Sequence, residues 1–190
     1  IRTRLVGSEM CIRDSYVGDY SRFVDAYSKI VMHEYTHIHQ LRPQINTTIS
    51  NDGNETRAMP GWFLEGGAEL FAIMAVNEVN GLNNLDDEYL LNLNELKKNK
   101  YNLPSITERL QKFGRSQSYE YADYALSVYA VGYMISRTDI QRVYMDLINN
   151  VYTQGWEQAF LDTMGFNLEV FYQSFEDHMT QSDSILLAAL

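Results

Sequence analysis

Cysteine is almost absent from this chain, since Cys11 is its only cysteine among 190 residues. We therefore expect neither an intrachain disulfide nor a thiol nucleophile. Long apolar runs are missing too, and no stretch approaches the roughly 20 apolar residues that cross a membrane. Basic residues are few: 15 Lys and Arg stand against 25 Asp and Glu, for a net charge of −10. This balance argues against nucleic acid as a partner.

The N-terminal segment 1–15 differs in character from the rest of the chain. Val6 to Ser15 resembles the translation of a sequencing adaptor, so we exclude segment 1–15 from fold prediction and expect the native N-terminal part to be missing. Residues 16–178 are long enough for one domain with a hydrophobic core. Residues 179–190 are expected to be a C-terminal tail or the start of a missing region.

The pattern His33-Glu34-x-x-His37 is the clearest chemical motif in the chain. On an α-helix, side chains four residues apart project from one face, so two imidazoles can bind one metal ion. Glu34 points to a neighbouring side, where its carboxylate can reach a metal-bound water without binding the metal itself. The alternative interpretation is a helix with two surface histidines and a glutamate between them.

A catalytic zinc site needs a third protein ligand besides two histidines and keeps one position open. The extended motif with a third histidine is absent, because Gln40 and Pro43 occupy the positions of its glycine and histidine. A carboxylate is available at Glu65, and Glu69 follows one helical turn later. Tryptophan, phenylalanine and leucine surround both glutamates in sequence, which is unusual for the alternative, an acidic pair on the surface.

The motif His-Glu-x-x-His followed by Trp-x-x-Glu-Gly-x-Ala resembles the gluzincin metallopeptidases, the thermolysin and aminopeptidase-like clan with a peptidase MA-like domain. The resemblance implies that His33, His37 and Glu65 bind Zn²⁺, that Glu34 is the general base, and that Glu69 orients a ligand histidine. The sequence His-Glu-Tyr-Thr-His resembles that of bacterial collagenases, and the 28 residues from His37 to Glu65 are more like their spacing than the shorter one of thermolysin. The family also implies a small β-sheet before the metal-binding helix, which we expect to be truncated here, and an extracellular or periplasmic location.

The fold predicted from the sequence is mainly α, and no convincing strand pattern follows Tyr16. Apolar spacing and end signals predict helices over residues 22–40, 61–80 with Gly81 at the end, 85–98, 105–113, 119–135, 140–150, 156–164 and 168–179. A polar loop, residues 41–59, separates the first two. The first helix is expected to have an apolar side made of Phe23, Tyr27, Ile30, Val31, Tyr35 and Ile38.

Gly66 and Gly67 lie inside the second predicted helix, where each costs roughly 1 kcal/mol relative to alanine. This cost indicates a close approach to another backbone, and we expect it to be that of the metal-binding helix. His39 lies two residues after His37, so it should face away from the metal as a partly exposed polar residue.

The expected activity is hydrolysis of internal peptide bonds in a peptide or protein substrate. The resemblance implies an additional donor that stabilises the oxyanion, for which Tyr129, Tyr133 and, more weakly, His178 are candidates; a core or surface role is the competing interpretation for each. An aminopeptidase would need a carboxylate group for the free amine of its substrate, and no such motif is visible. A binding or scaffold domain that has lost turnover, and a helical protein without a metal, remain the alternatives.

Overall fold

The computed structural model describes residues 20–41, 58–81, 94, 106–113 and 121–181. All regular structure in these ranges is helical and none is strand, which confirms the mainly α prediction. Within the same ranges, no helix combines the length and the apolar character needed to span a membrane. Segment 1–15, nearly all of the loop 41–59, the helix predicted over 85–98 apart from Asn94, and residues 182–190 lie outside the described residues.

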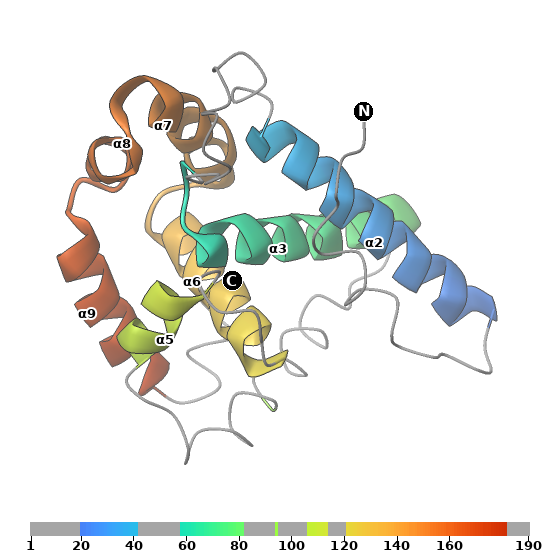
Figure 1. Ribbon diagram of the computed structural model, residues 1–190. Coiled ribbons are helices and arrows are strands. Elements are labelled where there is room, and N and C mark those ends of the chain that lie inside the picture. The colour runs from blue at the N-terminus through green and yellow to red at the C-terminus, as the bar shows by residue number, and fades with distance from the viewer. Residues whose placement is uncertain (1–19, 42–57, 82–93, 95–105, 114–120, 182–190) are drawn as a thin grey trace, which may run out of the picture.

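The helices follow one another along the chain as labelled in Figure 1: α2 (Tyr20–Leu41), α3 (Gly61–Asn80), α5 (Ile106–Lys112), α6 (Tyr121–Arg137), η3 (Arg142–Leu147), α7 (Ile148–Gln154), α8 (Trp156–Met164) and α9 (Leu168–Met179). The bounds of α3, α8 and α9 are those predicted. The helix predicted over 140–150 instead contains a π-helical segment, η3, and continues through α7 to Gln154. Apolar spacing does not distinguish a π-turn from an α-turn, which is why the sequence did not show it.

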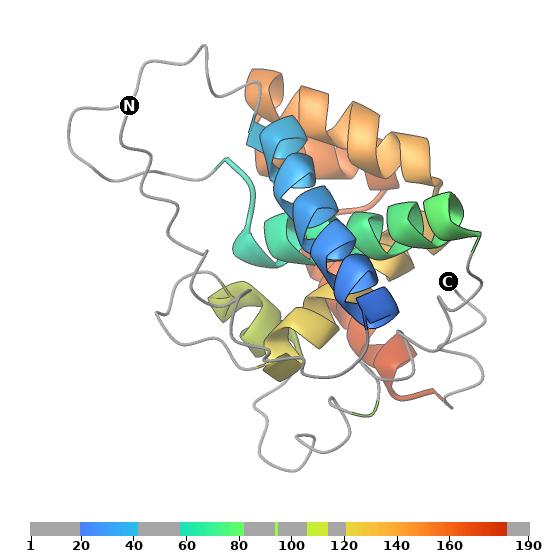
Figure 2. The same ribbon diagram turned by 90° about the vertical axis from the view of Figure 1, so that its right-hand side faces the viewer.

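Helix α3 is the central helix and packs against both α2 and α6 (Figures 1 and 2). Its sequence is apolar almost all round, as in a buried helix, and most of its residues from Gly61 to Asn77 are buried. It begins after Pro60, whose backbone is extended, and ends at Gly81, whose φ of 62° is left-handed. Both ends are therefore those that the sequence predicted.

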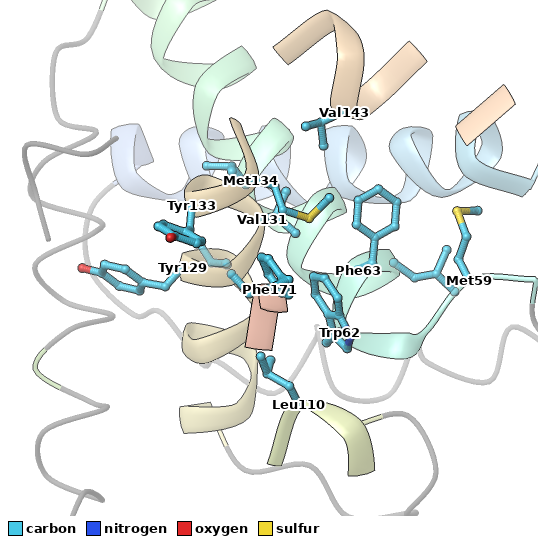
Figure 3. Packing of buried hydrophobic residues seen from close by; sticks show 14 of the residues in the cluster. Met59, Trp62, Phe63, Leu110, Tyr129, Val131, Tyr133, Met134, Val143 and Phe171 are labelled. Carbon is cyan, nitrogen blue, oxygen red and sulfur yellow. The ribbon is translucent and has the colours of Figure 1, made fainter. Parts of the chain in front are cut away.

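The hydrophobic core lies between α3, α5, α6, η3 and the C-terminal helices (Figure 3). Trp62 and Phe63 of α3 are completely buried, and the Trp62 ring stacks on Phe171 of α9 with 5.5 Å between centroids. Stacked and edge-on aromatic pairs of this kind add to the free energy gained by burying their area. The aromatic core thus fixes α3, which carries Glu65 and Glu69, relative to α6 and α9.

The predicted apolar side of α2 does not face this core. Its described members are mostly exposed, with exposed fractions of 53–62% at Tyr27, Val31, Tyr35 and Ile38. The helix instead turns a polar face to α3, on which His33, Thr36 and Gln40 are buried. These three residues are spaced at three and four along the helix, so they lie on one face. The two histidines of the His-Glu-x-x-His motif therefore lie on the face of α2 that is turned toward α3.

The two glycines inside α3 have different neighbours. A Cβ at Gly66 would lie 2.4 Å from the backbone carbonyl of Ser127 in α6, so the close backbone approach is to α6, and the predicted approach to α2 is wrong at this position. A Cβ at Gly67 would lie 3.0 Å from Nε2 of Gln40, a side-chain atom of α2. Glycine at 66 permits helix packing, and glycine at 67 leaves room for an amide.

Candidate metal centre

Three predicted ligands from two helices converge on one point. Nε2 of His33 and Nε2 of His37 are 3.1 Å apart, one turn from each other on α2. Oε2 of Glu65, on α3, lies 3.5 Å from each of these two nitrogens. The group His33, His37 and Glu65 can therefore hold a metal ion.

The separations between these three donor atoms fit a tetrahedral ion. Zinc binds imidazole nitrogen and carboxylate oxygen at about 2.0–2.2 Å, which at tetrahedral angles places two donors roughly 3.3 to 3.5 Å apart. The observed separations are 3.1, 3.5 and 3.5 Å. Two histidines and one carboxylate also form a common donor set of catalytic zinc, with the fourth position open.

Glu69 holds the far side of the His33 ring. Its Oε2 lies 3.1 Å from Nδ1 of His33, so the carboxylate accepts a hydrogen bond from that nitrogen and leaves Nε2 turned toward the other ligands. Its second oxygen, Oε1, is 2.7 Å from Nζ of Lys29. A chain of charge-assisted contacts thus runs from Lys29 through Glu69 to His33.

The ionisable groups of the site interact strongly because they lie close together and are partly buried from water. Burial alone would lower the pKa of His33, but its hydrogen bonds and charge attraction to Glu65 and Glu69 outweigh burial and raise the pKa to about 9. Burial alone would raise the pKa of each glutamate. Interactions with the imidazoles of His33 and His37 lower the pKa of Glu65 to about 2, and interactions with His33 and Lys29 do the same for Glu69.

Glu34 lies directly after His33 on α2 and is partly exposed. One residue along an α-helix turns the side chain by about 100°, so Glu34 lies beside the ligand face and not on it. On its other side lie the exposed Val31 and Ile38. A carboxylate at this border between the ligands and solvent can meet a molecule that approaches the open metal position.

Two residues that contact this site were not assigned from the sequence. Lys29 lies four residues before His33, and Gln40 lies three residues after His37, where its Oε1 is 2.8 Å from Nδ1 of the His37 ring. Both spacings put the side chain on the same helix face as its histidine, which is the signal that could have found them. The contacts of Lys29 and Gln40 with α3 could not be predicted from spacing within α2 alone.

His39 is partly exposed, as predicted, and its Nε2 donates a hydrogen bond to the backbone oxygen of Tyr144 in η3 at 2.9 Å. The Tyr144 hydroxyl in turn donates to the backbone oxygen of Gly67 in α3 at 2.5 Å. The π-helical segment therefore contacts both helices that carry the ligands, and π-turns frequently occur next to functional sites.

Two of the three candidates for an oxyanion donor, Tyr129 and Tyr133, are in core surroundings, whereas His178 is partly exposed. Tyr129 and Tyr133 are buried members of the hydrophobic cluster on α6 (Figure 3). The Tyr133 ring stacks on His178 of α9, with 4.8 Å between centroids, and also contacts Phe175. Burial lowers the pKa of His178, and the nearby Arg137 lowers it further. These contacts favour the core interpretation of both tyrosines and leave no residue assigned to the oxyanion.

Four of the predicted site residues are thus brought together: His33, His37 and Glu65 as a group that can hold a metal, and Glu69 behind His33. Glu34 lies next to this group on the same helix as His33. No model of a known protein family, no curated protein and no solved structure matches this chain.

Proposed function

We propose that this chain is a zinc-dependent peptidase that hydrolyses peptide bonds. The observation that carries the proposal is the convergence of His33 Nε2, His37 Nε2 and Glu65 Oε2 with mutual separations of 3.1 to 3.5 Å. Bound at such a site, zinc supplies Lewis-acid polarisation of a carbonyl group and a nucleophile at neutral pH.

Glu34 acts as the general base in this proposal. Its position beside the ligand face allows its carboxylate to take a proton from the attacking water and to pass that proton to the leaving amine. Because Glu34 is partly exposed, substrate and water reach it from solvent. It follows His33 directly on a rigid helix, so its distance from the ligands is fixed by the backbone of α2.

Glu69 and Lys29 orient His33 rather than react. The hydrogen bond from Nδ1 of His33 to Glu69 keeps the proton on that nitrogen, so Nε2 has its lone pair free for the metal. Lys29 balances the charge of Glu69 and fixes its second oxygen. The ring of His33 is therefore held in the tautomer and orientation that binding requires.

Metal content and peptide cleavage by the full chain test the proposal, with Glu65→Ala and Glu34→Gln as variants. We expect one zinc per chain by plasma mass spectrometry, a sharp loss in Glu65→Ala, and retained zinc without cleavage in Glu34→Gln. A well-folded wild-type chain without zinc would contradict the metal site. A Glu34→Gln variant as active as the parent would contradict the role of Glu34.

Peptides blocked at the N-terminus extend the test to the type of cleavage. We expect them to be cleaved, because an enzyme that cuts internal bonds does not need the free amine of its substrate. Cleavage confined to peptides with a free amine would instead identify an aminopeptidase.

A further inference from the structure

We propose that Gln40 is the positioning residue for the metal ligand His37, and that its amide selects the tautomer of that ring. The inference rests on the proposed function, since it concerns a ligand of the proposed zinc site. Gln40 is completely buried at the end of α2, one turn after His37. Its side chain reaches from His37 to the backbone of α3.

The hydrogen bonds of Gln40 determine which way round its amide lies. One end is 3.0 Å from the backbone oxygen of Leu64, which can only accept, so that end must be the Nε2 donor. The other end is then Oε1, an acceptor, and it lies 2.8 Å from Nδ1 of His37. Nδ1 must therefore carry the proton, and Nε2 of His37 keeps a free lone pair.

Nε2 of His37 is the ring nitrogen that faces His33 and Glu65. Nε2 of His37 is 3.1 Å from Nε2 of His33 and 3.5 Å from Oε2 of Glu65. Leu64, which receives the other end of the Gln40 amide, directly precedes Glu65 in α3. Gln40 thus couples the orientation of a ligand on α2 to the backbone position of the ligand on α3.

The surroundings of Gln40 hold the amide in place. Its backbone oxygen accepts a hydrogen bond from the Tyr152 hydroxyl at 2.6 Å, which fixes the end of α2 against α7. On α3, a Cβ added at Gly67 would lie 3.0 Å from Nε2 of Gln40, which is closer than ordinary van der Waals contact. Glycine costs roughly 1 kcal/mol in a helix interior, so a glycine here is explained by the space that the amide needs.

The rings of His33 and His37 are each oriented by an acceptor at Nδ1, but the two acceptors differ in charge. A carboxylate, Glu69, accepts from Nδ1 of His33, whereas a neutral amide accepts from Nδ1 of His37. A neutral partner orients the ring without adding negative charge to a site that already holds two glutamates. Partners of this kind commonly change metal affinity by about 10- to 100-fold when removed.

The variants Gln40→Met and Gln40→Glu test the inference, with Thr36→Val as a matched control. Methionine fills similar space but offers only a weakly accepting sulfur to His37, whereas glutamate keeps an acceptor oxygen. Thr36 is buried on the same face of α2, and its hydroxyl bonds to Met32 in its own helix. The readouts are the zinc dissociation constant, by competition with a chelator, and the ¹⁵N NMR signals of the His37 ring with zinc bound.

We expect Gln40→Met to weaken zinc binding by about 10- to 100-fold and to remove the protected Nδ1–H signal of His37. Gln40→Glu should recover part of the affinity, and Thr36→Val should change neither readout. In Gly67→Ala the new Cβ on α3 presses on the Gln40 amide, while Gln40 and His37 themselves are unchanged. This variant should also weaken zinc binding.

A Gln40→Met variant that binds zinc as tightly as Thr36→Val, with an unchanged His37 signal, would overturn the inference while leaving the proposed function intact. A folded wild-type chain that binds no zinc would overturn both. If Gln40→Met does not fold, Gly67→Ala decides, because zinc affinity equal to that of the wild type in this variant would count against the inference.

Discussion

At the scale of single residues, a proton and a metal ion would compete for the same atom, Nε2 of His33. The two Nε2 atoms of His33 and His37 are 3.1 Å apart, and two free lone pairs at that distance would repel each other. In the metal-free protein a proton on His33 relieves this repulsion, and Glu65 and Glu69 stabilise the resulting charge. In the proposed site, zinc would have to displace that proton, so one cation would replace another.

The stability of the metal-free chain should therefore depend on pH in a defined way. The pKa of His33 is about 9 in the folded state against 6.5 unfolded, so its contribution is complete below pH 6.5 and is lost as pH rises through 9. The pKa values of Glu65 and Glu69 are about 2 against 4.5, so their contribution is complete above pH 4.5 and is lost as pH falls through 2. Thermal unfolding of the chelator-treated chain should show a maximum between pH 4.5 and 6.5.

The variant His33→Gln provides the control for this pH dependence. It removes the group that titrates near pH 9, so the fall in unfolding temperature on the alkaline side should become shallower than in the wild type. A wild-type unfolding temperature that stays constant from pH 6.5 to 9 would contradict the charge arrangement described for His33.

At the scale of helices, the sequence predicted the bounds of α3, α8 and α9, but it did not predict which face of α2 packs inward. End signals are local: Pro60 and Gly81 bracket α3, and Gly165, with a φ of 78°, directly follows the last residue of α8. The face of α2 that packs inward was not predicted correctly. The apolar stripe predicted one face, but the polar face with His33 and Gln40 packs on α3.

The candidate site shows the same division. His33 and His37 follow from spacing within one helix, and Glu65 followed from a second motif and a family resemblance. Lys29 and Gln40 lie at helical spacings from His33 and His37, but no local pattern encodes their contacts with Glu69 and the Leu64 backbone of α3. The π-turn of η3 was equally invisible, since it inserts a residue without changing the apolar character of the helix.

The contact between α3 and α6 gives a prediction at this scale. In Gly66→Ala the new Cβ would meet the Ser127 backbone at 2.4 Å, and a backbone cannot rotate away as a side chain can. We expect a net loss of up to about 2 kcal/mol in the free energy of unfolding, since overpacking typically costs about 1–3 kcal/mol and the gain in helix propensity offsets about 1 kcal/mol of it. Urea unfolding of the metal-free chain measures it.

Gly67→Ala is the matched control for Gly66→Ala. Both changes occur inside α3 and gain about the same 1 kcal/mol of helix propensity. At Gly67, however, the new Cβ meets the end of the Gln40 side chain at 3.0 Å. Its loss of stability should be smaller than that of Gly66→Ala, and the reverse order would contradict the described packing of α3.

At the scale of the whole molecule, the helices are held in two different ways. An aromatic cluster joins α3 to α6 and α9 through Trp62, Phe171 and their neighbours (Figure 3). None of the described side chains of α2, residues 27–41, belongs to that cluster. Helix α2 is attached to α3 through His33, His37 and Gln40, and to η3 and α7 through the hydrogen bonds of His39 and Gln40.

A metal ion between His33, His37 and Glu65 would therefore cross-link α2 to the rest of the molecule. Removing zinc with a chelator should increase backbone hydrogen exchange in α2 far more than in α6 and α9, because the aromatic core does not depend on the ion. Zinc at 1,000 times its dissociation constant stabilises the state that binds it by about 4 kcal/mol. Exchange measured by mass spectrometry, peptide by peptide, with and without zinc, tests this.

The variant Glu65→Ala separates the cross-link from other effects of the ion. Without the carboxylate on α3, zinc bound weakly by the two histidines no longer connects the helices, so zinc should leave the exchange rates of α2 nearly unchanged. If zinc protected α2, α6 and α9 to the same extent in the wild type, the molecule would unfold as one unit. In that case α2 would belong to the same cooperative unit as the aromatic core, in spite of its polar attachment.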